Sequence, residues 1–355
     1  MKTSYFNQID GLRFVAIILV LIDHFAHFIG KKFHAGYYGV DLFFVISGFL
    51  ITNILLQQNG SFKLNYLNFI GRRILRIFPI YYMMIFLMYL CNYQPVHDYL
   101  IYFLTFTYNY AHALYLIPIN ALSHFWSLAV EEQFYILWPI FILTFKSKPK
   151  LIYTIILMII IICNIQLFFN IFPSISRYNY VGLFPQANAL STGALGVFLF
   201  KNKRVQDSYI MKSALFEYFV LIFLLLILLI PNHDKFILCP FISLYFVLKC
   251  SQVGFKSLRI NNFLSNKTII YIGAISYGIY VYHLPLDYFL TKYIFNPLFW
   301  DKINFENLGK LRVLELHPWL IKFPVYSILS FLLAHFSYKF IEKPILTLKD
   351  KYFRY

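Results

Sequence analysis

Runs of about twenty apolar residues recur along the chain, and short polar segments separate them. Residues 151–172 and 214–230 are two such runs. An α-helix rises about 1.5 Å per residue, so a run of this length is what a helix needs to cross the hydrocarbon core of a bilayer. We therefore predict an all-α fold, a polytopic integral membrane helical bundle. Its ten predicted transmembrane helices lie at residues 11–30, 38–58, 74–92, 122–145, 151–172, 180–200, 213–231, 234–249, 268–291 and 320–341.

The composition agrees with this pattern and excludes an ordinary soluble protein. Of the 355 residues, 60% are hydrophobic and only 13% are charged, whereas about a quarter of the residues of a soluble domain are charged. The many Phe and Tyr residues suit lipid contact and the membrane interface, so they need no functional interpretation. The four cysteines have no paired spacing, so we predict that they serve packing and form neither a disulfide nor a metal site. They are Cys91, Cys163, Cys239 and Cys250.

Basic residues set the predicted orientation. A formal charge of +16 is compatible with nucleic-acid binding, but the lysines and arginines fall mostly in short loops between apolar runs, so we predict no nucleic-acid partner. With both termini in the cytoplasm, 21 of the 31 lie in inside connections, nine in outside connections and Arg13 within the membrane. We predict one transmembrane domain at residues 1–345 and a short cytoplasmic tail at 346–355. The outer connections 93–121 and 292–319 are long enough to fold over a site.

Arg13 and His24 lie in the first apolar run, and an ionisable side chain at membrane depth indicates a functional site. Eleven steps of about 100° bring both side chains to within about 20° of one helix face, roughly 16 Å apart along the axis. A histidine alone would more often be a core residue bonded to a neighbouring helix, and an arginine alone would more often snorkel to the surface. Their shared face favours function, with His24 as a general base.

Asp41 enters the second span from the outer side, at roughly the depth of His24 on the preceding, antiparallel span. A carboxylate there could hold an imidazole in the tautomer that a base needs. The alternative, of comparable weight, is an interfacial aspartate solvated by lipid headgroups. Ser47 and Gly48 on the same span are small residues that suit close contact between helices.

Arg73 and Arg76 lie at the cytoplasmic start of the third span, three residues apart, and so share a helix face. Guanidinium groups at the lip of a membrane cavity suit phosphate recognition through paired hydrogen bonds. The alternative is ordinary positive charge on the inner side of a membrane protein.

Glu131 and Glu132 place two adjacent carboxylates in the middle of the fourth span, where they must face protein or water. The alternative is a buried polar tie between helices. His283 lies near the outer side of the ninth span, just before Pro285, which can kink the helix. We expect loop or interface roles for the other histidines, which are His27, His34, His97, His112, His124, His233, His317 and His335.

Several of these residues belong to strings that occur in a fixed order. The strings are Asp-Gly-Leu-Arg at 10–13, Gly-Val-Asp-Leu-Phe-Phe-Val-Ile-Ser-Gly-Phe-Leu at 39–50, Arg-x-x-Arg at 73–76, Trp-Ser-Leu-Ala-Val-Glu-Glu-Gln-Phe-Tyr at 126–135, Ile-Ser-Tyr-Gly-Ile-Tyr at 275–280 and Phe-Ile-Glu-Lys-Pro at 340–344. Together they resemble the acyltransferase-3 family of membrane O-acyltransferases. Residues 146–265 depart most from that family, and Phe14 replaces a usual glycine.

The resemblance implies a bacterial inner-membrane, multi-pass enzyme that moves an acyl group, most often acetyl, from cytoplasmic acetyl-CoA. The acceptor implied is a hydroxyl of a surface glycan or glycolipid, such as lipopolysaccharide O-antigen or exopolysaccharide. Because the chain ends at Tyr355, we expect the short form, without a periplasmic hydrolase-like domain. The alternative class is a transporter or flippase for a lipid-linked glycan. The expected partners are acyl-CoA, the acceptor and the bilayer; no oligomeric state is predicted.

The predicted mechanism assigns a role to each candidate residue. CoA docks against Arg73 and Arg76, with Arg13 near its pantetheine or phosphate portion. His24 either removes the proton of the acceptor hydroxyl or carries the acyl group itself. Asp41 or a fourth-span carboxylate, Glu132 in particular, orients His24. The supporting or substrate-binding residues are Glu131 and His283.

Overall fold

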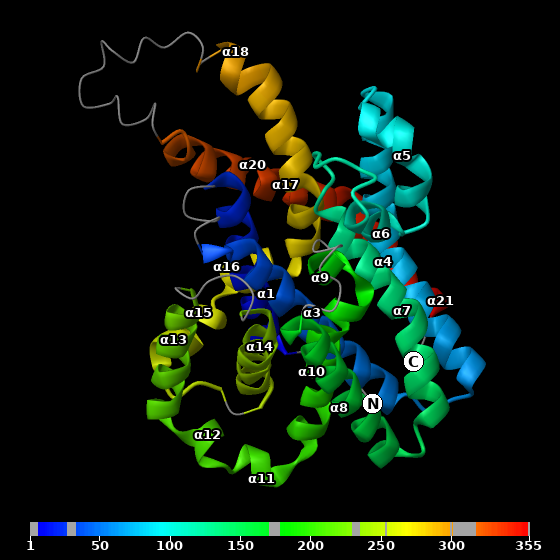
Figure 1. Ribbon diagram of the computed structural model, residues 1–355, viewed down its shortest axis with the longest axis vertical. Helices are drawn as coiled ribbons and strands as arrows, with labels where there is room; N and C mark the ends of the chain where they lie inside the picture. Colours follow the sequence, from blue (N-terminus) through cyan, green and yellow to red (C-terminus); the bar gives the residue numbers. More distant parts are fainter. Residues whose placement is uncertain are drawn as a thin grey trace.

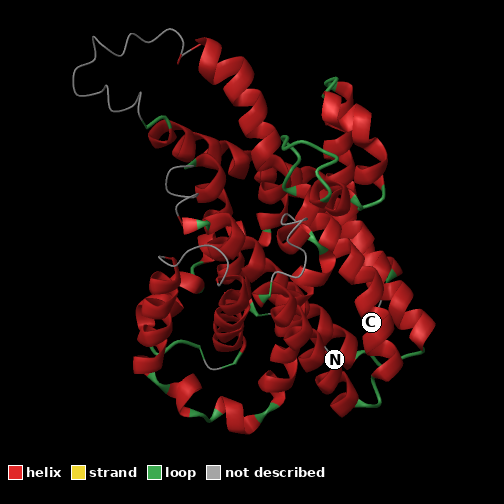
Figure 2. Cartoon of the chain, viewed as in Figure 1, coloured by secondary structure: helices red, strands yellow, loops and turns green. Residues whose placement is uncertain are grey.

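The computed structural model describes residues 6–26, 33–169, 178–228, 235–252, 254–298, 300 and 317–353. These residues form helices joined by short connections, and the described ranges contain no β-strand (Figure 2). The all-α prediction is thus confirmed for this part of the chain. The helices of the first half are α1 (Asn7–Phe25), α3 (Ala35–Gln57), α4 (Phe62–Leu90), α5 (Gln94–Leu104), α6 (Tyr108–Ala113), α7 (Phe125–Phe145) and α8 (Pro149–Phe168).

The second half continues in the same way (Figure 1). Its longer helices are α10 (Leu183–Lys201), α13 (Ala214–Leu228), α14 (Lys235–Ser251), α16 (Lys267–Ala274), α17 (Ser276–Leu290), α20 (Trp319–Ser337) and α21 (Lys343–Tyr352). Its shorter elements are α9 (Tyr178–Val181), α11 (Lys203–Gln206), α12 (Tyr209–Lys212), α15 (Leu258–Leu264), the π-helical turns η2 (Thr291–Phe295) and η5 (Tyr338–Glu342), and α18 (Asn296–Leu298).

Six helices in the described residues are long and apolar enough to cross a membrane, or seven if the bent pair α16–α17 counts as one span. These seven correspond to seven of the ten predicted spans. The remaining three, at 11–30, 213–231 and 234–249, correspond to α1, α13 and α14. Helix α1 carries Asp10, Arg13 and Asp23 within its 19 residues, and the apolar parts of α13 and α14 are short, at Ala214–Leu224 and Ile237–Ser251. The count of ten therefore stays a prediction.

Helix α3 lies at the centre of the bundle because it is apolar on every side. In its most apolar stretch 72% of residues are buried, against 28% in α8, which faces outward. Helices α1 and α10 both pack on α3. A helix that is hydrophobic all round gains most by burial on all sides, whereas one that faces lipid needs no protein cover. This places α1, and with it His24, next to the bundle core.

Glycines allow α3 and α10 to approach each other closely. A Cβ atom at Gly48 would lie 1.9 Å from the carbonyl oxygen of Leu190, and one at Gly193 would lie 2.0 Å from that of Val45. In a bilayer, helices associate through such close backbone packing because there is no hydrophobic driving force between them. The predicted close contact at Gly48 is thus observed, with α10 as the partner.

The first and last described residues lie at one end of the bundle. The ring of Phe6 packs against Phe49 and Phe200, with centroids 6.2 and 5.9 Å apart, near the last turns of α3 and α10. At the other terminus, the Arg72 guanidinium donates to the carbonyl oxygen of Phe353 at 2.6 Å, which ties the end of α21 to α4. That this end faces the cytoplasm stays a prediction.

We expect Gly48→Ala and Gly193→Ala each to lower the unfolding free energy by about 1–3 kcal/mol, because the added methyl group meets backbone that must shift. Thermal unfolding of the detergent-purified protein measures the effect. Gly60→Ala is the matched control, since the nearest atom to its added methyl group belongs to the Asn65 side chain, which can rotate. Equal stability of the three variants would contradict the close packing of α3 on α10.

Candidate active site

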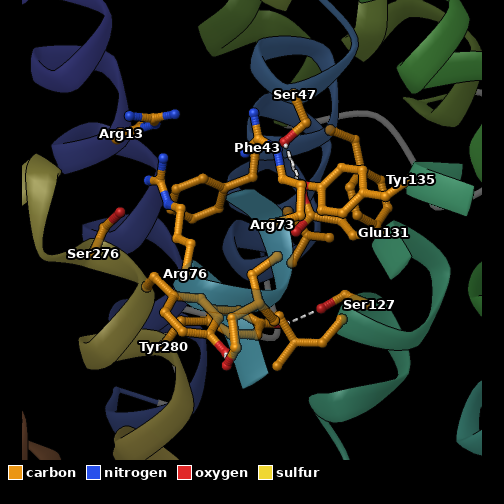
Figure 3. Close-up of a pocket in the computed structure, with 15 residues that line it drawn as sticks. Arg13, Phe43, Ser47, Arg73, Arg76, Ser127, Glu131, Tyr135, Ser276 and Tyr280 are labelled. Atoms are coloured by element: carbon orange, nitrogen blue, oxygen red, sulfur yellow. Dashed lines mark hydrogen bonds between the residues drawn. The ribbon is translucent and has the colours of Figure 1, made fainter. Parts of the chain in front are cut away.

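A cavity of about 80 Å³ lies between α1, α3, α4, α7 and α17. Four of the predicted site residues line it: Arg13, Arg73, Arg76 and Glu131. Figure 3 shows the three guanidinium groups at one end of this arginine pocket, with the hydroxyls of Ser127 and Tyr280 at the other. The first apolar run and the Arg-x-x-Arg string, 60 residues apart in the sequence, therefore meet at one cavity.

The arginine pocket has an excess of positive charge. Arg13 forms an ion pair with Asp10 at 2.6 Å. The guanidinium carbon of Arg73 lies 5.3 Å from the ring centroids of both Phe69 and Tyr135. Among the described residues, no ion pair is formed by Arg73 or Arg76. Arginines held this way present donors in a fixed fork geometry that fits phosphate oxygens. The pocket thus gathers three guanidinium groups and one carboxylate, Glu131.

Hydrogen bonds fix the opposite wall of the arginine pocket. Ser47 Oγ donates to Glu131 Oε1 at 2.8 Å, which joins α3 to α7. The hydroxyls of Ser127 and Tyr280 lie 2.6 Å apart and both donate to the carbonyl oxygen of His124, at 3.0 and 3.1 Å. They fasten α17 to the first turn of α7. Glu131 is thus a member of the pocket wall.

Three histidines meet just beyond Tyr280. Nδ1 of His24 lies 3.1 Å from Nε2 of His283, and their ring centroids are 4.9 Å apart. The ring of His124 packs against that of His283 with centroids 4.7 Å apart. His283 is fully buried and His124 is 3% exposed. Helices α1, α17 and the residue before α7 thus converge on one histidine cluster, defined here as His24, His124 and His283.

Backbone carbonyls determine the tautomers in the histidine cluster. Nδ1 of His283 lies 2.6 Å from the Tyr280 oxygen, which can only accept, so this nitrogen carries the proton and Nε2 carries the lone pair. That lone pair accepts from Nδ1 of His24, which also lies 3.0 Å from the Val20 oxygen. In its neutral form His24 is therefore protonated on Nδ1, and its lone pair is on Nε2. This is the tautomer that a general base or nucleophile requires, with a third group that orients it.

The side chain hydrogen-bonded to His24 Nδ1 is a histidine, His283, whereas the sequence predicted that a carboxylate orients His24. Asp41 is 1% exposed, and neither of its carboxylate oxygens has a hydrogen-bond partner among the described residues. Oε1 of the buried Glu132 has none either in this part of the chain. The structure therefore brings Arg13, Arg73, Arg76 and Glu131 together, and separately joins His24 to His283. It does not join Asp41 to His24 by a hydrogen bond.

His124 is the functional candidate that sequence reasoning missed. From the sequence a loop or interface role is expected for it, because its context is not comparable to that of His24 or His283. Its Nε2 donates to the carbonyl oxygen of Val281 at 3.3 Å, and its Nδ1 is buried without a partner among the described residues. The sequence signal that could have indicated it is its position, two residues before the Trp-Ser-Leu-Ala-Val-Glu-Glu-Gln-Phe-Tyr string at 126–135.

A comparison with protein families identifies the family of this chain. A family described as an acyltransferase domain, Acyl_transf_3, matches residues 6–338. The chain belongs to the acyltransferase-3 family. The resemblance carried by the sequence strings is thus confirmed, and this acyltransferase domain spans nearly the whole chain.

Curated relatives cover the same region of this acyltransferase domain. YrhL of Bacillus subtilis is 29% identical over 97% of this chain and 55% of its own length. The peptidoglycan O-acetyltransferase OatA of Listeria monocytogenes is 28% identical over 96% and 56% of the two chains. The O-acetyltransferase OatA of Staphylococcus aureus is 26% identical over 96% and 57%. The chain thus spans little more than half the length of these relatives. No solved structure matches it.

If the arginine pocket is an anion site, inorganic pyrophosphate should stabilise the purified protein against heat. At a concentration ten times the dissociation constant the expected gain is about 1.4 kcal/mol. The gain should disappear in an Arg73→Gln, Arg76→Gln double variant, because the donors are lost. Arg204→Gln, at an exposed position outside the pocket, serves as the control and should respond like the parent. A double variant stabilised as strongly as the parent would rule out this site.

Proposed function

We propose that the protein transfers an acetyl group from acetyl-CoA to a hydroxyl of a glycan on the other side of the membrane, with His24 as the reacting residue. Family membership and the O-acetyltransferase names of the relatives from Listeria monocytogenes and Staphylococcus aureus support the reaction class. The name of the Listeria relative favours peptidoglycan as the acceptor, in place of the lipopolysaccharide or exopolysaccharide that the sequence suggested.

The supporting observation is the position of the histidine cluster between two cavities. On α17, Tyr280 lines the arginine pocket, whereas Leu284 and Asp287 line a second cavity, and His283 lies between them. The segment that enters α7 repeats the arrangement in the opposite direction. Asn120 lines the second cavity, Ser127 lines the arginine pocket, and His124 lies between them. The histidine cluster thus lies between residues of the two cavities in both segments, although none of the three histidines lines either cavity.

The arginine pocket would hold the donor. The phosphates of CoA are anions, and the three guanidinium groups are concentrated at the end of the pocket farthest from Tyr280 (Figure 3). The pantetheine arm would then extend past Ser127 and Tyr280, so that its thioester approaches the histidine cluster. Arg13 and His24 are about 16 Å apart along α1, which gives the length that the arm has to cover.

Apart from the donor and the acceptor, the reaction requires only side chains of this protein. As a base, His24 Nε2 takes the proton of the acceptor hydroxyl while the hydroxyl oxygen attacks the thioester carbonyl carbon. The new ester C–O bond forms, the thioester C–S bond breaks, and the imidazolium returns its proton to the CoA thiolate. If His24 acts instead as an acyl carrier, the same Nε2 attacks the thioester carbonyl carbon first, the C–S bond breaks and CoA leaves as the thiolate. The acceptor hydroxyl oxygen then attacks the acetyl carbon, the C–N bond to His24 breaks, and the hydroxyl proton passes by way of Nε2 to the CoA thiolate. In both routes His283 is a positioning residue that keeps the Nδ1 proton in place.

We expect His24→Ala to lower acetyl transfer by at least about a hundredfold, because no other group supplies the reacting nitrogen. The assay follows radiolabelled acetyl from acetyl-CoA to glycan fragments with the protein in proteoliposomes. His97→Ala is the control, because its ring contacts Tyr89 and lies outside the cluster. Undiminished transfer by a folded His24→Ala protein would refute the proposal. Glycan flux across the vesicle without label transfer would instead support the transporter alternative.

Position 283 should tolerate only a side chain that can accept the hydrogen bond from His24 Nδ1. We expect His283→Leu to lower kcat by about tenfold to a hundredfold, since the Nδ1 proton of His24 loses its buried acceptor. His283→Gln should recover a substantial part of this loss, because its side-chain oxygen can accept the same hydrogen bond. Steady-state kinetics at saturating acetyl-CoA distinguish the two variants. Equal losses in both would mean that His283 serves packing alone.

A further inference from the structure

A second cavity, of about 520 Å³, begins one turn beyond His283. One wall is formed by α17 and its continuation through η2 to α18, and the other by residues that precede α7 together with Tyr93. In Figure 1, α17 rises from the bundle toward α18 at the same end as α5, opposite α11 and α12. We call this cavity the distal groove. The residues used below are Tyr93, Asn120, Asp287, Tyr288, Thr291 and Lys292.

The lining of the distal groove differs from that of an apolar cavity elsewhere in the bundle. Another cavity of about 520 Å³, between α1, α3, α14 and α15, is lined mainly by leucine, isoleucine, valine and phenylalanine. The distal groove instead combines two tyrosines with a carboxylate, an ammonium, a hydroxyl and amides. A few polar groups among apolar and aromatic walls are typical of sites that orient a polar small molecule.

Aromatic rings form a rigid corner in the groove. The rings of Tyr93 and Tyr288 meet edge to face, with centroids 5.0 Å apart at an angle of 69°. The Tyr93 hydroxyl accepts from the backbone N–H of Ala121 at 2.8 Å, which fixes it to the segment entering α7. Such a corner offers apolar ring faces beside polar groups. A sugar ring, with apolar C–H faces and a rim of hydroxyls, complements both.

The charges in the groove are balanced, in contrast to the arginine pocket. Asp287 is its acidic residue and Lys292 its basic residue. Thr291 Oγ1 donates to Asp287 Oδ1 at 3.1 Å, and Lys292 Nζ donates to the Tyr288 hydroxyl at 3.0 Å. Each charged group is therefore held in place by a neighbour on the same wall. A single carboxylate accepts hydrogen bonds from adjacent hydroxyls, whereas the three guanidinium groups of the arginine pocket would select phosphate.

The carboxylate of the groove is close to the histidine cluster along the helix. Asp287 follows His283 by four residues, so the two side chains share a face of α17 and lie about 6 Å apart along the axis. A hydroxyl-bearing ring held by Asp287 would thus lie about one helical turn from the cluster. At that distance from the cluster, a neighbouring hydroxyl of the same sugar ring could point toward His24.

We propose that the distal groove is the acceptor site and binds one saccharide ring of the glycan, stacked on Tyr288 and hydrogen-bonded to Asp287. This inference rests on the proposed function, because it identifies the acceptor side of the same reaction. The acceptor enters from the end of the bundle opposite the arginine pocket, and only its reacting hydroxyl reaches the histidine cluster.

The test compares KM for the two substrates in groove variants. The acceptor is a set of soluble peptidoglycan glycan-strand fragments released by muramidase, and the donor is radiolabelled acetyl-CoA. Tyr288→Ala and Asp287→Asn should each raise the acceptor KM about tenfold and leave the acetyl-CoA KM within about twofold. Tyr293→Ala is the matched control, since Tyr293 lies on the same helical extension but does not line the groove.

A binding measurement keeps the inference testable if a variant loses activity for another reason. In the His24→Ala background, the fragments should raise the melting temperature of the protein, and Asp287→Asn should remove that rise. If the parent transfers label but both groove variants keep the parental acceptor KM, the groove assignment is wrong while the proposed function stands. If the parent transfers no label to any glycan, the proposed function itself fails.

Discussion

The hydrogen bond between His24 Nδ1 and His283 Nε2 is the interaction on which the site depends. Two polar rings at membrane depth must satisfy each other or a backbone carbonyl, because lipid offers no partner. The bond ties α1 to α17, and Tyr280 ties α17 to the residue before α7. Three helices distant in the sequence are thereby fixed around one nitrogen. The arginine pocket and the distal groove are placed on either side of it by the same helices.

The division between the two cavities follows from helix geometry. Residues 280, 283 and 287 on α17 differ by one helical turn each, so consecutive turns face the arginine pocket, the histidine cluster and the distal groove. The segment around His124 runs in the opposite direction and contributes residues in the reverse order. Two antiparallel segments with matched spacing therefore place the histidine cluster between the two cavities. The charge around each cavity follows from its helices: α1 and α4 supply arginines, whereas α17 supplies one acid and η2 one base.

The sequence predicted much of this arrangement, for identifiable reasons. Apolar run length located α3, α4, α7, α8 and α10, and the spacing of Arg73 and Arg76 correctly indicated one shared face. Charge inside α1 and short apolar stretches in α13 and α14 explain why fewer helices than predicted meet the criteria for a span. The partner of His24 could not be read from one sequence, because periodicity gives the face of a helix but not the neighbour it meets. For that reason Asp41 was preferred over His283, and His124 was overlooked.

The layer between the two cavities consists of buried side chains: His124 is 3% exposed, Tyr280 6% and His283 0%. A protein that passes a whole cofactor or sugar through its interior must open a wide path, and ions can follow. Under the proposed transfer from acetyl-CoA, the two large molecules would never need to exchange sides, since a two-carbon fragment is the only part that would cross the layer. The thioester would then supply the driving force, so no ion gradient would have to be spent. The permeability barrier could thus stay closed to ions during turnover.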